Sequence, residues 1–214
     1  MPLNGVRTAA IAAQYSGSNQ AGANLGAASE GGAREGGAGE GGANEGANKR
    51  ERTMAVSLRE SVQRVSDPRS LDASVEEVFR LMLGLECQRD AGTAVVENES
   101  VTAVVGFGGL LSGACVFRSG AGAARKIAAQ MTGMEFTAID DTVKDGIGEI
   151  CNMLAGSWKG KVPELAANCG LSIPAVITGR DYNLHVQAPE FQLRHTYRFG
   201  DEVFEVSIVC DGLQ

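Results

Sequence analysis

Long hydrophobic runs, aromatic side chains and clustered positive charge are all scarce in this chain. No apolar run approaches the roughly 18 residues that a membrane-spanning helix needs, and the N-terminus lacks the hydrophobic region of a secretory signal. Lys and Arg form no compact stripe interleaved with aromatics, and the net charge is −7. Such a surface repels phosphate, which argues against nucleic-acid binding. We therefore expect a cytoplasmic protein that binds neither a membrane nor a nucleic acid.

Cysteines and histidines are not arranged as a metal site or a redox motif. The five cysteines include no CxxC pair and four of them lie within apolar runs, which is typical of small buried side chains in a reducing compartment. His185 and His195 have no cysteine or acid at a metal-ligand spacing, so we expect ordinary surface or half-buried histidines. GFGGLLSG, residues 106–113, lacks the GK[ST] of a phosphate loop and favours a tight turn between strands. We expect no cofactor or metal to be bound by this chain.

The composition divides the chain near residue 54. Residues 1–53 are rich in Gly, Ala and Glu, with a glutamate at every fifth position from Glu30 to Glu45. This period gives no useful apolar face, so we expect a disordered tail at 1–53 and one folded domain at 54–214. The tail carries five basic and five acidic residues, so the whole net charge belongs to the domain. Met54 is an alternative start of the protein.

Hydrophobic periodicity after residue 54 predicts a mixture of helices and strands. Residues 54–65 favour either a short helix or an extended lead-in, which Asp67-Pro68 interrupts. Ser74 followed by Glu77 is a capping-box pattern that places the first helix at about 74–87. It puts five apolar residues at helical spacing: Val75, Val78, Phe79, Met82 and Leu85. Further helices are expected at about 120–134 and 141–160, the second capped by Asp140 or Asp141.

Strands are expected in seven β-rich runs: 93–97, 101–107, 112–118, 172–179, 185–189, 192–199 and 202–211. Strands joined as closely as the early ones must be antiparallel, because a parallel pair needs a long crossover. We therefore predict the α+β class, a sandwich in which about three helices cover a mostly antiparallel sheet.

The expected helix at 141–160 contains DGIGEICNMLAGSWKGK and has two distinct faces. At 100° per residue, five apolar side chains fall within about 60° of one direction: Ile147, Ile150, Cys151, Leu154 and Trp158. A polar stripe occupies the opposite side: Asp145, Glu149, Asn152, Gly156 and Lys159. Glu149 and Asn152 are i,i+3 neighbours, so both can reach one object docked there. By itself, Glu-x-x-Asn on an outward face is a common coincidence.

Several ordered blocks resemble the CheX branch of the CheC/CheX/FliY family of bacterial chemotaxis proteins. These are VEEVFRLMLGLE, VVGFGGLLSGACVF, ARKIAAQMTGME, DDTVKDGIGEICNMLAGSWKGK and GLSIPAVITG. The family signature is Asp or Ser, then Glu, then Asn three residues later, and Pro some twenty residues beyond. Asp145, Glu149, Asn152 and Pro174 match it, although the spacing to the proline is about a residue off. CheC proteins carry a second site on the first helix, whereas here Arg80 stands three residues after Glu77, so one site is expected.

The resemblance implies a CheC/CheX-like αβ sandwich and a sheet-to-sheet homodimer. It also implies a phosphatase that removes the phosphoryl group from a phosphoaspartate on a CheY-like response regulator, whose receiver domain supplies Mg²⁺. Glu149 and Asn152 are then the catalytic residues, and Asn152 orients the attacking water as a glutamine does in GTPases. Asp145, Gly156 and Lys159 are expected to contact the partner.

Two other interpretations use the same resemblance. A CheX-like module could bind a receiver domain without turnover, and only release of phosphate in the presence of Mg²⁺ separates that module from an enzyme. A structural adaptor at the flagellar switch is less favoured, because the chain shows no additional switch-protein domain.

Overall fold

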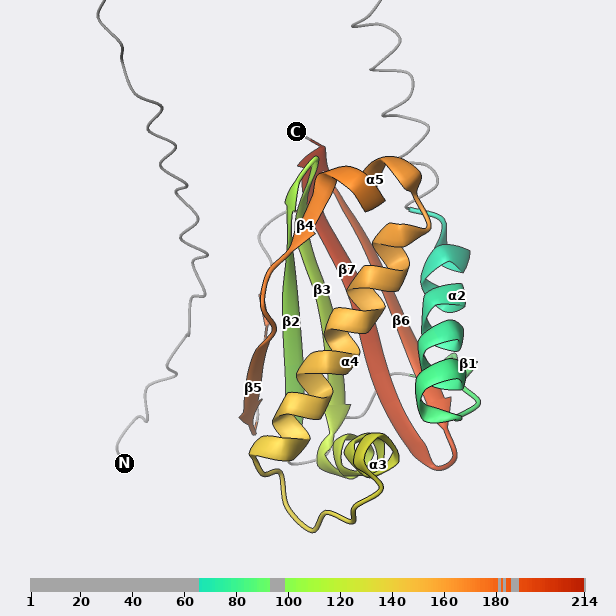
Figure 1. Ribbon diagram of the computed structural model, residues 1–214, viewed down its shortest axis with the longest axis vertical. Helices are drawn as coiled ribbons and strands as arrows, with labels where there is room; N and C mark the ends of the chain where they lie inside the picture. Colours follow the sequence, from blue (N-terminus) through green and yellow to red (C-terminus); the bar gives the residue numbers. More distant parts are fainter. Residues whose placement is uncertain (1–65, 93–98, 181, 183, 186–188, 214) are drawn as a thin grey trace, which may run out of the picture. The chain divides into compact units, whose positions relative to one another are not determined.

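The computed structural model describes residues 66–92, 99–180, 182, 184, 185 and 189–213. The predicted tail at 1–53 and the segment 54–65 lie outside these residues, as do the expected strand at 93–97 and most of the one at 185–189. Within the described part, seven strands form one sheet in which each pairing is antiparallel. The helices cover one face of this sheet (Figure 1). The predicted α+β class is therefore confirmed.

The strand order across the sheet is β1-β6-β7-β3-β2, and two short strands share the far edge of β2. Strand β4 pairs with the end of β2 at Phe107–Gly109, whereas β5 pairs with its beginning at Ser100–Val104. The long strands are β2 (Ser100–Gly109), β3 (Leu111–Gly120), β6 (Phe191–Phe199) and β7 (Glu202–Leu213), and the short ones are β1 (Gln88–Asp90), β4 (Cys169–Leu171) and β5 (Ala175–Gly179). The strands expected at 101–107, 112–118, 192–199 and 202–211 are confirmed, but that at 172–179 begins three residues later. Strands β1 and β4 have three residues each, which is too short for hydrophobic periodicity to predict them.

The turn between β2 and β3 contains the glycine-rich segment predicted to join two strands. Gly109 has φ +107°, and a Cβ at this position would lie 2.4 Å from the main-chain oxygen of Asn168. That oxygen accepts a hydrogen bond from the amide of Leu110. The turn therefore needs a glycine both for its conformation and for the close approach of the chain at the end of α5 (Pro163–Asn168).

Helix α4 (Asp141–Gly160) crosses the sheet diagonally, with α3 (Ala121–Thr132) near its N-terminus (Figure 1). Both lie close to the predicted bounds. Asp140 is the N-cap of α4, and its carboxylate accepts a hydrogen bond from the amide of Val143 at 2.9 Å. This arrangement satisfies one of the free amides of the first turn.

Helix α2 (Pro68–Val78) begins six residues earlier than predicted. Asp67 is the N-cap and accepts from the amide of Arg69, while Pro68 occupies the first turn. Proline is favourable there because its missing N–H would have no helical partner. Asp67-Pro68 thus starts a helix rather than interrupting one, and the predicted cap at Ser74 is wrong. Ser74 is buried within the helix, and its hydroxyl donates to the main-chain oxygen of Ser70.

A π-helical turn, Phe79–Leu83, follows α2 and ends at Gly84 in the left-handed conformation. The wider turn shifts the side chains relative to an α-helix, so that Phe79 and Leu83 are buried whereas Leu81 and Met82 are 63% and 60% exposed. The prediction that Met82 belongs to the apolar stripe is therefore wrong. The prediction assumed α-helical spacing through Phe79–Leu83, where the chain forms a π-helical turn with a different spacing.

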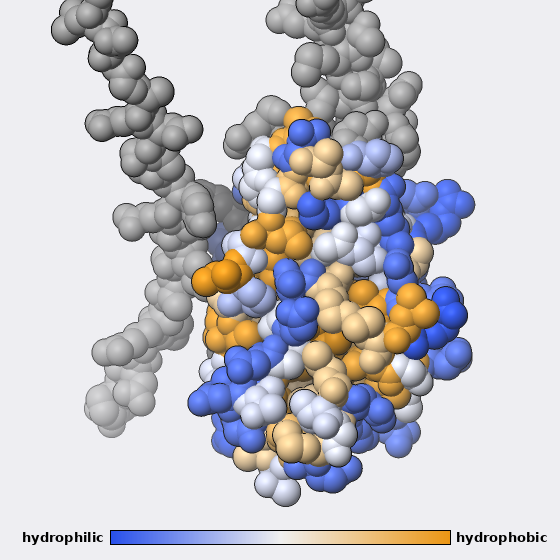
Figure 2. Space-filling model, viewed as in Figure 1, coloured by the Kyte–Doolittle hydropathy of each residue, from blue (hydrophilic) through white to orange (hydrophobic). Residues whose placement is uncertain are grey.

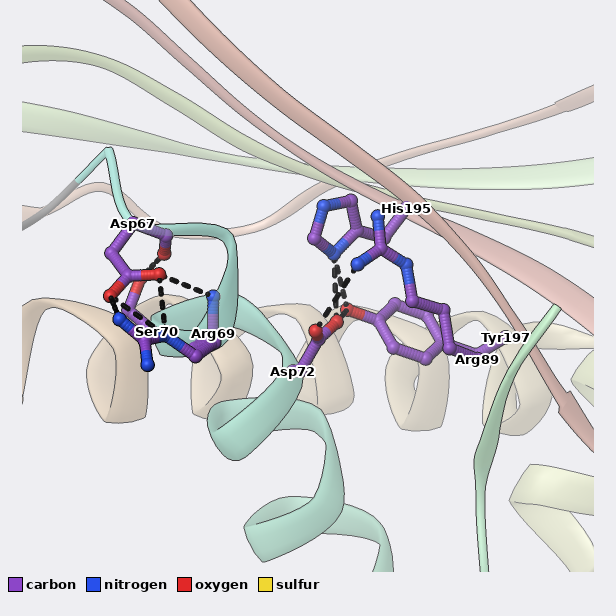
Figure 3. Close-up of polar contacts among 7 residues, drawn as sticks. All are labelled: Asp67, Arg69, Ser70, Asp72, Arg89, His195 and Tyr197. Carbon is purple, nitrogen blue, oxygen red and sulfur yellow. Dashed lines mark hydrogen bonds and ion pairs between the residues drawn. The ribbon is translucent and has the colours of Figure 1, made fainter. Parts of the chain in front are cut away.

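A polar cluster joins α2 to the sheet (Figure 3). One carboxylate oxygen of Asp72 lies 2.8 Å from Nδ1 of His195 and accepts a 2.8 Å hydrogen bond from the hydroxyl of Tyr197, while the other pairs with Arg89 at 3.4 Å. Burial and the bond to Asp72 raise the pKa of Tyr197. His195 is buried at 6% exposure, deeper than the half-buried histidine expected, and its ring and Tyr197 secure α2 against β6.

Replacing Asp140 by Ala should lower the free energy of unfolding by about 1 kcal/mol, because the amide of Val143 loses its acceptor. Chemical denaturation with a circular-dichroism readout measures the change. Asp140→Asn, which keeps an acceptor, should stay close to wild type. The comparison is the exposed neighbour Asp141, whose carboxylate pairs with Lys144 while Asp140 is the N-cap. Equal losses for Asp140→Ala and Asp141→Ala would contradict the assignment of the cap.

Candidate functional site on helix α4

The apolar stripe of α4 is buried as the sequence predicted. Five side chains are between 0% and 1% exposed: Ile147, Ile150, Cys151, Leu154 and Trp158. The Trp158 ring packs against Phe107 of β2 with 5.2 Å between centroids. The Cys151 thiol points into the core, where its sulfur lies 3.5 Å from the main-chain oxygens of Ala103 and Cys115, and its single S–H can donate to either oxygen. Trp158 and Cys151 are therefore core residues, and Cys151 is not placed to act as a nucleophile.

The opposite side of α4 carries the predicted polar residues at the surface. Asp145 and Glu149 are exposed, and Asn152 is partly exposed. Within the described part of the chain, neither the Glu149 carboxylate nor the Asn152 amide takes part in a hydrogen bond or ion pair. A carboxylate and a neutral amide thus project from one rigid helix, one turn apart, with their polar atoms open to an incoming molecule.

Two glycines let neighbouring segments approach α4 on either side of these residues. At Gly148 an added Cβ would lie 3.3 Å from Pro174 Cβ and 3.4 Å from a Val176 methyl group, so the chain before β5 packs tightly there. At Gly146 an added Cβ would lie 3.5 Å from the Met131 sulfur on α3. Pro174, the last residue of the predicted signature, is thus placed against the helix that carries the other three. The role of Gly148 was not predicted, because it depends on contact with Pro174, which is distant in the sequence.

Gly156 and Lys159 lie further along α4. An added Cβ at Gly156 would meet only Leu171, at 4.0 Å. The Lys159 ammonium donates to the main-chain oxygens of Ala166 and Cys169, at 3.2 and 2.6 Å. Lys159 therefore secures the end of α5 to α4. The sequence did not predict this structural contact, and the expected contact of Lys159 with a partner stays a prediction.

Glu77 on α2 occupies the position at which CheC proteins would carry a second site. Its Oε2 accepts hydrogen bonds from the Lys161 ammonium at 2.9 Å and from the Ser157 hydroxyl at 3.0 Å. These bonds lower the pKa of Glu77. The carboxylate thus links α2 to the C-terminal part of α4, in contrast to Glu149, which has no such partner among the described residues.

The remaining titratable groups suggest no other site. Among the described residues, no three His, Cys, Asp or Glu side chains are grouped to hold a metal ion. Cysteines 115, 151, 169 and 210 are buried and Cys87 is half-buried, in agreement with the prediction of small core side chains. Burial raises the pKa of Cys87 and of Cys210 to about 12. No helix in the described ranges is long and apolar enough to span a bilayer.

The surface around α4 is mixed in character. Figure 2 shows hydrophilic residues along the helix with hydrophobic surface on both sides of them. The exposed large apolar residues include Ile173 at 88%, beside β5, and Leu81 and Met82 after α2. Protein interfaces combine apolar and polar side chains, so this mixed surface is compatible with binding another protein.

Comparisons with known proteins agree with this arrangement. The family model described as chemotaxis phosphatase CheX matches residues 101–195, which include α4 and Pro174. The CheY-P phosphatase CheX of Thermotoga maritima is 31% identical over 119 residues, covering 54% of this chain and 77% of that protein. This chain belongs to the CheX family. The resemblance of the sequence blocks is thereby confirmed.

Solved structures show the same fold at low sequence identity. The chemotaxis protein CheX from Vibrio vulnificus superposes with a TM-score of 0.58 at 20% identity, covering 66% of this chain and 94% of that one. CheX in the CheX–CheY–BeF₃–Mg²⁺ complex from Borrelia burgdorferi gives a TM-score of 0.56 at 20% identity, with 67% and 97% covered. These similarities confirm the CheC/CheX-like sandwich predicted from the sequence.

Replacing Glu77 by Gln should destabilise the protein at pH 7 by up to about 1 kcal/mol, because a partly exposed ion pair with Lys161 is lost. The pKa of Glu77 is lower in the folded protein, so its contribution is complete above the pKa of the unfolded chain. It is lost as the pH falls through the folded-state value. Urea unfolding of both proteins at several pH values measures this. A difference that grows toward acid pH would contradict the ion pair.

Proposed function

We propose that this protein hydrolyses the phosphoaspartate of a CheY-like response regulator. Membership of the CheX family supports this activity, since the relative in Thermotoga maritima is named a CheY-P phosphatase. The complex from Borrelia burgdorferi supports a CheY-like partner, because it contains CheX together with CheY, BeF₃ and Mg²⁺. The observation that carries the proposal is the pair of Glu149, which is exposed, and Asn152, which is partly exposed, on α4. Neither side chain makes a hydrogen bond or ion pair within the described chain.

The reaction needs little chemistry from this chain. A phosphoaspartate is an acyl phosphate and is already reactive, so hydrolysis requires a water molecule aligned with the bond that breaks. The water oxygen attacks phosphorus, the bond to the aspartate oxygen breaks, and inorganic phosphate and a free carboxylate result. Phosphoryl transfer is accelerated mainly by positioning and charge stabilisation, so no nucleophile on this chain is required.

Asn152 is the residue that we assign to water positioning. Its amide oxygen can accept a hydrogen bond from the attacking water, and the group does not titrate near neutral pH. Because α4 is held by its buried stripe, the amide is presented from a rigid backbone rather than from a loop. Its partial exposure allows a partner to reach it without unfolding any part of the described chain.

Glu149 is assigned to docking through an ion pair with a lysine in the active site of the receiver. Such a charge-assisted contact fixes the register of two surfaces. Asp145, one turn earlier and also exposed, adds negative charge to the same face. The Mg²⁺ that the reaction uses belongs to the receiver domain in this proposal, and this chain binds no cofactor.

A sheet-to-sheet homodimer is a further part of the proposal. On the face of the sheet opposite the helices, the Tyr182 hydroxyl donates to Thr102 at 2.6 Å and the Arg118 guanidinium lies 5.4 Å from the Tyr182 ring centroid. The Tyr182 side chain therefore already covers part of this face. Multi-angle light scattering gives the mass in solution, and a monomer at micromolar concentration would exclude the dimer.

Asn152→Ala should reduce phosphate release from a phosphorylated receiver by a factor on the order of 10², as for the loss of one preorganised polar group. Binding should remain, because a small amide contributes little contact area. The decay of radiolabelled receiver measures turnover. The control is Gln130→Ala, which removes an exposed amide from α3. Wild-type turnover by Asn152→Ala would refute the assignment of water positioning.

Glu149→Ala should weaken both affinity and turnover, since the docking ion pair is lost. The expected decrease in affinity for the Mg²⁺- and BeF₃-loaded receiver is on the order of tenfold or more. Isothermal titration calorimetry at low and high salt measures it, and the difference from wild type should shrink with salt. Glu76→Ala removes an exposed glutamate from α2 and should have no effect. Unchanged affinity for Glu149→Ala would exclude its docking role.

The same assays separate an enzyme from a module that only binds. A wild-type protein that binds the loaded receiver yet leaves the lifetime of the phosphoryl group unchanged would show binding without turnover.

A further inference from the structure

The segment Leu171–Pro174 runs alongside α4, directly next to the exposed pair. Leu171 approaches the helix at Gly156 and Pro174 approaches it at Gly148. These two glycines are eight residues apart, about 12 Å along the axis, and the three steps of the segment span roughly 10 Å if extended. The residues between the two contacts therefore lie level with the turn that contains Asn152.

The backbone of this segment is held in place by β2. Ser172 and Gly106 are joined by two hydrogen bonds, from the Ser172 amide to the Gly106 oxygen at 2.9 Å and from the Gly106 amide to the Ser172 hydroxyl oxygen at 2.8 Å. The Ser172 hydroxyl also donates to the main-chain oxygen of Ile173 at 2.9 Å. Pro174, which follows, restricts Ile173 to extended conformations. Ile173 thus sits on a fixed piece of backbone between two packed neighbours.

The side chain of Ile173 nevertheless projects into solvent. It is 88% exposed, the highest value among the exposed large hydrophobic residues in the described ranges. An isoleucine so placed contributes almost nothing to the core. Because its side chain is branched at Cβ and its backbone is fixed, it has little freedom to lose when it is covered. These are the properties of an anchor residue in a protein–protein interface.

We propose that Ile173 is a specificity-determining contact, which inserts into an apolar depression on the receiver domain beside its phosphoaspartate. The identity of the partner rests on the proposed function. A protein that contacts Glu149 and Asn152 from the solvent side lies beside the segment that carries Ile173, so we assign the apolar contact and the polar pair to one partner. Ile173 contributes to binding of the receiver domain, whereas Asn152 contributes to hydrolysis of the phosphoryl group once the receiver is bound.

The test compares Ile173→Ala, Ile173→Asp and Ile173→Leu. Probes are purified CheY-like receivers from the source genome, phosphorylated with acetyl phosphate or loaded with Mg²⁺ and BeF₃. Ile173→Ala should raise KM and Kd on the order of tenfold and leave kcat unchanged, and Ile173→Asp should raise them further. Ile173→Leu should stay within about threefold of wild type. Leu81→Ala removes another exposed apolar side chain and should behave as wild type, and melting temperatures should not change.

Failure of this proposal is distinct from failure of the proposed function. Turnover by wild type together with an unchanged KM and Kd for Ile173→Ala would overturn the role of Ile173 alone, as would a loss confined to kcat or an equal loss for Leu81→Ala. A wild-type protein that binds the BeF₃-loaded receiver but releases no phosphate from the phosphorylated receiver would refute the enzyme. In that case weaker binding by Ile173→Ala, rescued by Ile173→Leu, would still support the contact.

Discussion

The burial of one stripe of α4 against the sheet is the constraint on which the site depends. Ile147, Ile150, Cys151, Leu154 and Trp158 lose nearly all contact with water, and this fixes the rotation of the helix about its axis. A shift of one residue would turn the helix by about 100° and expose these side chains. The positions opposite the stripe must then face solvent, so Glu149 and Asn152 are held at the surface by hydrophobic packing rather than by contacts of their own.

Neighbouring segments pack against α4 on both sides of Glu149 and Asn152. Gly148 admits Pro174 on one side, and Gly146 admits Met131 of α3 on the other. The polar pair is thereby framed by packed segments at fixed distances. This packing suits a reaction in which the protein only aligns a water molecule and a partner. In such a reaction the protein has to supply rigid positions for its side chains rather than a reactive group.

Glu77 and Glu149 show how environment separates two residues of one type. Both lie on helices over the same face of the sheet. Glu77 is engaged by Lys161 and Ser157 and joins α2 to α4, whereas Glu149 has no partner within the described chain. A similar division holds for the polar cluster at Asp72, where His195, Tyr197 and Arg89 converge on one carboxylate. These groups satisfy each other and hold α2 against β6.

Local pattern was enough to determine α4 and its two faces and to narrow its cap to Asp140 or Asp141, because amphipathic spacing and capping depend only on neighbouring residues. The family was indicated by the order of several sequence blocks. It was not enough where the chain departs from a regular period. The π-helical turn after Val78 placed Met82 in solvent, and Asp67-Pro68 began the helix expected at Ser74. Only the tertiary structure decided that Pro174 rests on Gly148, that Lys159 binds the carbonyl groups at the end of α5, and that Ile173 stands in solvent level with Asn152. Those contacts join residues that are distant in the sequence, and their geometry is set by how strands pair and helices pack.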